Sequence, residues 1–337
     1  MEFVVEYGVF LAKAVSVAII VLLLGGMLIG GAVSRVRGSK AESSSPGNLS
    51  IRHLNADFEQ SAMKIDAATL PGKLQKALRK KLKATRKQRR SEKRRKIFVI
   101  DFHGDIRASA TSALREEVTA LLSVADPPDE VVVRLESVGG MVHSYGLAAA
   151  QLKRIRDRGI RLTVSVDKVA ASGGYMMACV ADRIIAAPFA ILGSIGVIAA
   201  MPNFNRVLKK HDIDYEQFMA GEYKRTVTLF GENTDRERDK FQQDIEDVHA
   251  LFKEFVHSHR AQVDLDKAAT GEYWYGLRAL DLKLTDELLT SDDYLLGAST
   301  EADLYQLRWE TEKSWLERFT SESVSESVSR IFFAKSS

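Results

Sequence analysis

The sequence predicts an α/β protein in which a mainly parallel sheet, covered by helices, follows one N-terminal membrane-spanning helix. From residue 97 onward, short apolar and β-branched runs alternate with helical patterns, which is typical of parallel strands joined by helices. Residues 14–34 carry no charge. At about 1.5 Å per residue, that run is long enough to cross the hydrocarbon core of a bilayer as a helix.

Composition excludes several other classes of protein. Of the 337 residues, 45% are hydrophobic and 28% are charged, which are ordinary globular values and argue against wholesale disorder or a collagen-like repeat. The single cysteine, Cys179, excludes an intramolecular disulfide framework and a cysteine-based zinc site.

The first predicted segment, residues 1–36, consists of the membrane helix and its flanks. A cleaved signal peptide is the alternative, but its leader is normally basic, and this leader contains two glutamates and one lysine. Arg35, Arg37 and Lys40 follow the apolar run. Positive charge favours the cytoplasmic side, so charge counting alone places the rest of the chain in the cytoplasm.

A polar linker and a highly basic strap make up the second segment, residues 37–96. Within it, residues 73–96 hold 14 Lys and Arg and one acidic residue. The strap can be a solvated helix or spacer, or it can bind anionic membrane lipid. It contains no aromatic side chain for base stacking, which disfavours nucleic acid as a partner.

The third segment, residues 97–296, is the predicted folded domain. Its boundaries come from strand-like and helix-like patterns that are closed by turn residues. The expected strands are 97–102, 131–135, 161–166, 183–187 and 190–198, and the expected helices are 109–123, 144–157, 173–181, 203–211 and 234–260.

Two glycine-containing turns in this domain follow predicted strands, where ligands gather in parallel sheets. Ser172 opens a predicted helix, and the free N–H groups there favour a developing negative charge. A nucleophilic serine also needs oxyanion donors. The N–H of Gly173 is adjacent, and the Gly139–Gly140 turn can supply a second donor.

The base that would activate Ser172 is not fixed by these patterns. No histidine lies between residues 144 and 210, although one can approach in space. A buried lysine can act instead if its pKa falls towards neutrality. Lys168 and Lys224 are the two candidates, and spacing alone does not choose between them.

Taken in order, the motifs of this domain resemble those of a known family. They are SVGG at 137–140, ASGGYMMACVAD at 171–182, GSIGV at 193–197 and GEYKR at 221–225. Over residues 97–296 the chain is similar to the serine peptidases of the signal peptide peptidase A family, most closely its SohB-like branch.

This resemblance implies a ClpP/crotonase-like fold and a Ser–Lys dyad, with no metal and no other cofactor. The matching residues are Ser172 as the nucleophile, Lys224 as the general base, Ser194 as the residue that orients the lysine, and Gly139 and Gly173 as oxyanion donors. Gly140 is the alternative to Gly139. Val138 replaces the family's usual proline, so we expect a less rigid turn there, and Lys283 replaces a glycine in a later motif away from the dyad.

The resemblance also implies homo-oligomeric rings in which the dyad can be completed between protomers. The implied substrates are membrane-associated or unfolded peptides, such as signal-peptide remnants. The implied location is the bacterial inner membrane with a periplasmic catalytic domain, which opposes the charge count. We adopt the periplasmic side as the expectation.

The fourth segment, residues 297–337, is predicted to be a helical appendage. Leu304, Leu307, Trp315 and Phe319 fall on one apolar stripe at helical spacing. That stripe can pack on the chain's own domain or form a contact between copies.

Three alternative functions remain open from the sequence. The fold can serve as a non-catalytic membrane scaffold, in which the dyad is vestigial. It can carry a Ser–His–Asp triad, or it can be a crotonase-type enzyme that acts on acyl-CoA. The presence of both Ser172 and Lys224 favours the peptidase.

Overall fold

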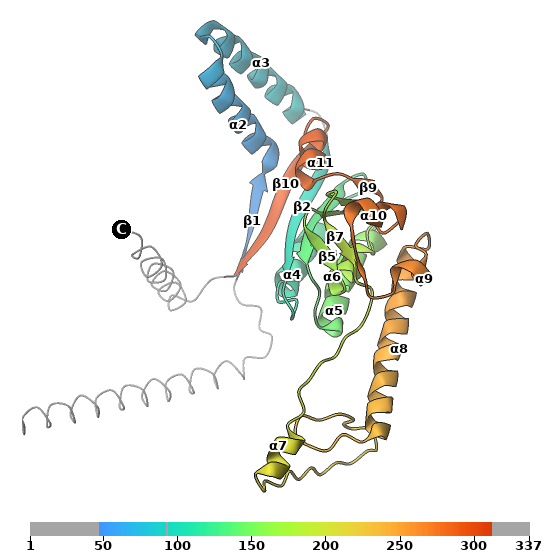
Figure 1. The fold of residues 1–337 in the computed structure, drawn as a ribbon. Helices are drawn as coiled ribbons and strands as arrows, with labels where there is room; N and C mark the ends of the chain where they lie inside the picture. Colours follow the sequence, from blue (N-terminus) through green and yellow to red (C-terminus); the bar gives the residue numbers. More distant parts are fainter. Residues whose placement is uncertain (1–46, 92–93, 312–337) are drawn as a thin grey trace, which may run out of the picture. The chain divides into compact units, whose positions relative to one another are not determined.

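The structure, a computed structural model, describes residues 47–91 and 94–311. Figure 1 shows its elements. The strands are β1 (Gly47–His53), β2 (Arg95–Gly104), β3 (Glu130–Ser137), β4 (Arg161–Val166), β5 (Val169–Ala171), β6 (Arg183–Ala186), β7 (Ile191–Gly193), β8 (Tyr273–Tyr275), β9 (Glu287–Leu288) and β10 (Ala302–Thr311). The helices are α2 (Leu54–Thr69), α3 (Gly72–Ser91), α4 (Thr111–Leu122), α5 (Val142–Asp157), α6 (Gly173–Ala178), α7 (Asn205–Lys210), α8 (Asp235–His259), α9 (Leu265–Ala268), α10 (Gly276–Asp281) and α11 (Ser291–Ala298).

The sheet is mixed but mainly parallel, and helices connect most of its strands. Its main path runs β1-β10-β2-β3-β4-β6-β9, and the steps from β10 to β9 are parallel. A branch leaves this path where β5 pairs with β3 and β7, and β7 pairs antiparallel with β8. The predicted α/β class is confirmed, and the branch carries the turn that contains Ser172.

The two faces of the sheet differ because successive strand residues point to opposite sides. On β2, Phe98, Ile100 and Phe102 belong to the larger apolar core, together with residues of α4, α5 and α6. Ile97 and Val99 face the other way, into a smaller cluster with residues of α2, α11 and β10. Burying each such side chain stabilises the fold by about 1.5–3 kcal/mol.

The end of the described chain differs from the predicted helical appendage. Residues Ala302–Thr311 form strand β10, which lies between β1 and β2. The spacing of Leu304 and Leu307 fits one helix face, but in a strand it places the two leucines on opposite faces. They lie in separate apolar clusters. Trp315 and Phe319 lie outside the described residues.

The predicted linker also contributes to the sheet. Residues Gly47–His53 form its edge strand β1. The buried side chain of Asn55, at the start of α2, is hydrogen-bonded to the chain around the start of β10. The Asn55 Nδ2 donates to the carbonyl oxygens of Ser299 and Ala302 at 2.9 and 3.0 Å, and its Oδ1 accepts from the Leu304 N–H at 2.7 Å. The folded unit therefore begins about fifty residues before the predicted boundary at residue 97, and spans Asn48–Glu310.

Most of the basic strap is helical, as one of the two structural interpretations expects. Helix α3 follows α2 after a short turn, and the Gln75 Nε2 donates to the carbonyl oxygens of Ala67 and Leu70. Within residues 47–91 and 94–311, no helix is long and apolar enough to cross a membrane. The predicted membrane helix at residues 14–34 lies outside the described residues.

A buried glutamate joins α4 to β10 and gives a testable pH dependence. The Glu117 Oε1 accepts from the Trp309 N–H at 2.7 Å. Burial raises the pKa of Glu117 from 4.5 to about 7, against the lowering effect of this hydrogen bond. Between these values the folded state binds more protons than the unfolded state, so the free energy of unfolding should fall as pH rises from about 4.5 to 7.

Glu117→Gln keeps an acceptor but cannot ionise. We expect this variant of the full chain to be more stable than the native chain at pH 8, by up to about 3 kcal/mol. The advantage should shrink below pH 7 and vanish near pH 4.5. Urea unfolding at pH 5 and pH 8 measures it, with Glu116→Gln at the less buried neighbouring position as the control. An equal advantage at both pH values would contradict the assignment.

Candidate active site

Ser172 lies at the turn between β5 and α6 in a strained conformation. Its φ is 51° and its ψ is −119°, a region that costs a non-glycine residue about 1–3 kcal/mol. The Ser172 N–H donates to the Gly193 carbonyl oxygen at 2.8 Å. All six residues of α6, which follows Ser172, are buried. The hydrogen bond to Gly193 and the packing of α6 therefore both hold the turn, while Ser172 itself stays half-exposed.

The Gly139 turn lies directly against Ser172. Gly139 has a φ of +91°, and a Cβ placed there would lie 2.7 Å from both the Gly173 N and the Ser172 Cβ. At Gly173, a Cβ would lie 2.4 Å from the Tyr145 ring. These approaches are too close for any side chain, so both positions require glycine. The structure thus brings together the two turns that the sequence singles out.

The N–H groups of these turns are not equally free. The Gly139 N–H donates to the Ser137 Oγ at 3.1 Å. The Tyr145 hydroxyl donates its hydrogen to the Asp105 carbonyl oxygen at 2.7 Å, so the Ser137 hydroxyl donates to the Tyr145 oxygen at 2.6 Å. Within the described residues, the N–H groups of Gly140 and Gly173 make no hydrogen bond.

An open pocket of about 640 Å³ lies beside Ser172 and the Gly139–Gly140 turn. Ser172, Ser194 and Gly139 all line it, and its remaining walls are largely apolar or backbone. The lining consists of residues 138–140, Val142, Ser172, Ser194, residues 196–198, His249, Thr270 and Gly271. Several of the apolar side chains at the rim are exposed, including Ile198 at 90% and Val138 at 66%.

Ser194 shares the pocket but does not contact a lysine. Its φ of 50° is unusual for a serine. The Ser194 N–H donates to the Glu272 carbonyl oxygen at 2.7 Å, and its Oγ donates to the Gly271 carbonyl oxygen at 3.3 Å. In a single chain the Ser194 hydroxyl is therefore directed to the backbone next to β8.

Lys224 does not line the pocket of its own chain. It lies exposed in the segment between α7 and α8. The neighbouring residues Glu222 and Tyr223 contact Arg236, in the first turn of α8. Figure 1 shows this segment at the end of α8 that is remote from the sheet. About 20 Å of helix separates Arg236 from His249, where α8 reaches the pocket.

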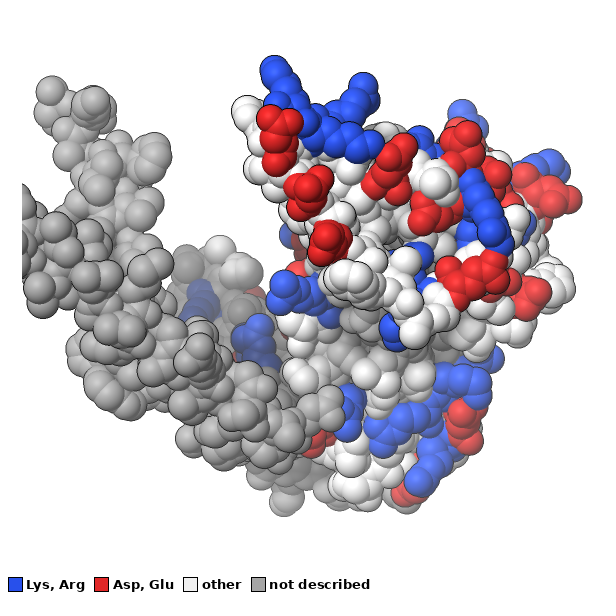
Figure 2. Space-filling model, turned by 90° about the horizontal axis from the view of Figure 1, so that it is seen from below, with Lys and Arg blue, Asp and Glu red and all other residues white. Residues whose placement is uncertain are grey.

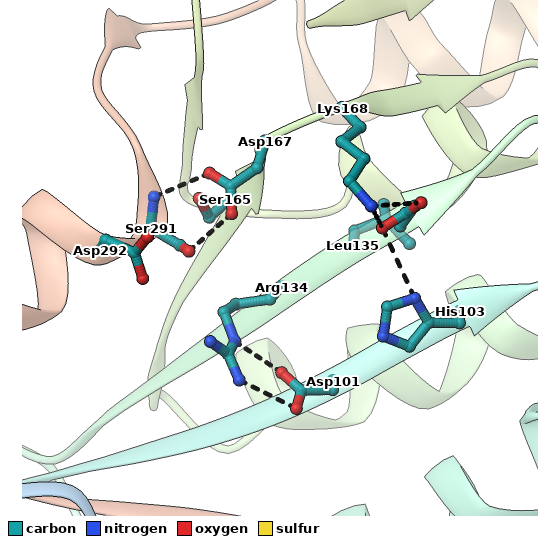
Figure 3. A pocket seen from close by; sticks show the side chains of 10 residues that line it. Asp101, His103, Arg134, Leu135, Ser165, Asp167, Lys168, Ser291 and Asp292 are labelled. Carbon is teal, nitrogen blue, oxygen red and sulfur yellow. Dashed lines mark hydrogen bonds and ion pairs between the residues drawn. The ribbon is translucent and has the colours of Figure 1, made fainter. Parts of the chain in front are cut away.

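Lys168 lies in a different place from Ser172. Its ammonium group pairs with the Glu136 carboxylate at 3.0 Å, and the His103 ring lies 3.7 Å from the same carboxylate. These side chains line a separate pocket of about 310 Å³, in which Asp101 also pairs with Arg134 (Figure 3). Lys168 is therefore a surface ion-pair residue in this chain, and the geometry gives it no role at Ser172.

Sequence patterns did not identify His249 as a site residue, yet it lines the Ser172 pocket. It follows Ser172 by 77 positions and sits on the long helix α8. Its Nε2 lies 3.1 Å from the Ile195 carbonyl oxygen. Among the described residues it is the only ionisable side chain that lines this pocket. No carboxylate in the described part of the chain hydrogen-bonds to it, so the geometry shows no Ser–His–Asp triad.

Comparison with known proteins identifies the family. Residues 2–152 match the model of the peptidase family S49 N-terminal region, and residues 154–305 match the model of peptidase family S49. The chain is 44% identical over 330 residues to a probable protease SohB of Haemophilus influenzae, covering 93% of this chain and 91% of that protein. It is 52% identical over 245 residues to a probable protease SohB of Buchnera aphidicola subsp. Acyrthosiphon pisum, covering 72% and 73%. The chain therefore belongs to peptidase family S49, in the SohB-like branch of the signal peptide peptidase A family.

Proposed function

We propose that this peptidase-family chain is a membrane-anchored serine endopeptidase of ClpP/crotonase-like fold, with Ser172 as its nucleophile and Lys224 as its general base. The observation that carries the proposal is the turn at Ser172. A strained, half-exposed serine lies at an open pocket, between two glycine turns with free N–H groups. Strained backbone at a pocket is characteristic of functional sites.

The proposed chemistry follows from these groups. Neutral Lys224 removes the proton of the Ser172 hydroxyl, and the oxygen attacks a peptide carbonyl. The N–H groups of Gly173 and of the 139–140 turn hold the resulting oxyanion. Because the Gly139 N–H is already bound to Ser137, Gly140 is the better second donor. The lysine then passes its proton to the leaving amine, and water hydrolyses the acyl-enzyme.

Lys224 would meet the serine of a neighbouring protomer. Lys224 does not line the pocket of its own chain. Its neighbours Glu222 and Tyr223 contact Arg236 in the first turn of α8, the end of that helix that Figure 1 shows away from the sheet. The segment around Lys224 exposes large apolar side chains, among them Phe218 at 90% and Tyr223 at 51%, and exposed apolar surface of this kind usually marks an interface. Head-to-tail contacts that repeat around an axis close into a ring, and Ser194 could then orient the incoming lysine.

Membrane attachment would keep this site near its substrates. The uncharged run at residues 14–34 is the proposed anchor in the bacterial inner membrane, with the catalytic domain on the periplasmic side. Helix α3 would add attraction to anionic lipid through its lysines and arginines. By contrast, in the view of Figure 2 the described surface mixes Lys and Arg with Asp and Glu. The exposed apolar rim of the pocket suits extended, unfolded or membrane-derived peptides.

Covalent labelling tests the nucleophile directly. The detergent-solubilised full chain is treated with a fluorophosphonate, and the modified residue is mapped by mass spectrometry. We expect modification at Ser172, with loss of hydrolysis of an unfolded protein and a signal-peptide-like peptide. Labelling of another serine, or hydrolysis that survives full modification, would reject the proposal. An unmodified chain that binds CoA would favour the crotonase alternative, and one that neither reacts nor hydrolyses would favour the scaffold.

A further inference from the structure

We propose that His249 is a positioning residue of this site, which holds the Gly193–Ile195 turn behind Ser172 through a hydrogen bond from its ring to the Ile195 carbonyl. The proposal rests on the proposed nucleophilic role of Ser172. It gives a role to His249, the residue of α8 that lines the Ser172 pocket.

The Gly193–Ile195 turn supports Ser172 directly. The Gly193 carbonyl oxygen accepts the Ser172 N–H at 2.8 Å, so movement of Gly193 would move the strained serine. Gly193 and Ser194 both have positive φ values, of 92° and 50°. Glycine adopts such a φ without strain, but the serine conformation persists only where the surroundings hold it.

Two hydrogen bonds from different parts of the chain restrain this turn. On one side, the Ser194 N–H donates to the Glu272 carbonyl oxygen at 2.7 Å, next to β8. On the other side, His249 contacts the Ile195 carbonyl oxygen at 3.1 Å. Among the described residues, no backbone N–H donates to that carbonyl, so the His249 ring is its partner.

Helix α8 holds His249 firmly enough to act as a support. Phe252 and Val256 are 4% and 0% exposed and belong to the main core. They follow His249 by three and seven positions, so all three lie on one face of the helix. His249 is thus the polar member of the face that packs against the body of the domain.

The same hydrogen bond shows that the Nε2 of His249 is not the general base for Ser172 in this conformation. A carbonyl oxygen can only accept, so the Nε2 must carry the hydrogen. A nitrogen that already carries its hydrogen and donates it to Ile195 cannot accept the proton of Ser172. The geometry therefore assigns His249 the role of hydrogen-bond donor to the Ile195 carbonyl oxygen. A different side chain with an N–H group of similar reach can fill that role.

Three variants of the full chain separate these roles. His249→Gln keeps an N–H donor of similar reach, His249→Leu removes it, and His257→Leu changes an exposed histidine on the same helix. The first measurement is the rate constant for fluorophosphonate labelling of Ser172. The second is hydrogen exchange of the backbone amides over residues 172 and 192–196, which does not depend on catalysis.

We expect labelling of His249→Leu to be roughly ten- to a hundred-fold slower, as for a small misplacement of a reacting group. Amide exchange at Ser172 and Ser194 should be faster in that variant. His249→Gln should stay within a few-fold of the native rate, and His257→Leu should match it. Native labelling of His249→Leu would overturn the proposal. So would a His249→Gln variant as slow as His249→Leu, because imidazole chemistry would then be needed.

The exchange measurement separates this proposal from the one on which it rests. If the native chain is never labelled at Ser172, the proposed nucleophile fails. Exchange at Ser172 and Ser194 would still report whether His249 holds the turn. Unchanged exchange in His249→Leu, in a chain that is labelled normally at Ser172, would reject only the role of His249.

Discussion

Alanine at either Ser172 or Lys224 is expected to abolish peptide hydrolysis, and mixing the two inactive proteins is expected to restore part of it. Loss of a nucleophile or of its base costs about a thousand-fold or more in rate. Restoration follows from the placement of the two residues. Ser172 lines the pocket, whereas Lys224 is held near the first turn of α8, about 20 Å of helix away from the pocket.

The recovered activity can be predicted from a head-to-tail ring. A Lys224→Ala protomer still supplies Ser172, and a Ser172→Ala neighbour still supplies Lys224. With random mixing of equal amounts, about a quarter of the sites would hold both native residues. The experiment denatures and reassembles the two full-length variants together, and measures hydrolysis of an unfolded protein. Each variant reassembled alone gives the baseline.

Lys210→Ala is the matched control, because Lys210 is an exposed lysine in α7, shortly before the segment that contains Lys224. It should remain active alone. A mixed oligomer that stays inactive, although it assembles, would contradict completion of the dyad by a neighbour. Activity of Lys224→Ala alone would reject Lys224 as the base, and the ring of His249 would then need to be tested in that role.

Local patterns in the sequence predicted most elements of the folded domain. The expected strand 161–166 matches β4 (Arg161–Val166), and the expected helix 234–260 matches α8 (Asp235–His259) within one residue at each end. Both have strong local signals. The strand is a β-branched run, and α8 begins with a capping box at Thr234 and Glu237.

Elements that depend on distant pairing were harder to predict. Strand β10 is stabilised by its parallel pairing with β2, a partner about two hundred residues earlier. The expected strand at 190–198 is only Ile191–Gly193, because the chain leaves the sheet at the turn that supports Ser172. The residues that follow are apolar enough for a strand, but Ser194 and residues 196–198 line the pocket instead.

The residues of the candidate site likewise differ in how far the sequence could predict their positions. Motif order singled out Ser172, Ser194 and Gly139, and the structure places these three residues at one pocket. Motif order could not place Lys224 in space, because the length and direction of α8 decide where that segment lies. Nor could it find His249, whose signal is a single polar residue on the buried face of a helix.

Gly139→Ala is expected to remove activity almost as completely as loss of the nucleophile, without a change in any ionisable group. The new Cβ would lie 2.7 Å from the Gly173 N and from the Ser172 Cβ, and 2.8 Å from the Ala171 carbonyl oxygen. Two of these three atoms belong to the backbone of the nucleophile turn and cannot rotate aside. The φ of +91° at this position adds strain for any L-residue.

The turn at residue 139 must therefore move away from Ser172 and Gly173, and the proposed second oxyanion donor, the Gly140 N–H, must move with it. Loss of one such donor slows catalysis by about a hundred- to a thousand-fold, so we expect at least that loss in both labelling and peptide hydrolysis. Gly146→Ala in α5 is the matched control, because a Cβ at Gly146 meets nothing within 4 Å. That variant should keep full activity and gain about 0.5–1 kcal/mol of helix stability. A Gly139→Ala chain that hydrolyses peptide at the native rate would show that the 137–140 turn does not form the oxyanion site, and would transfer that role to the Ser172–Gly173 side alone.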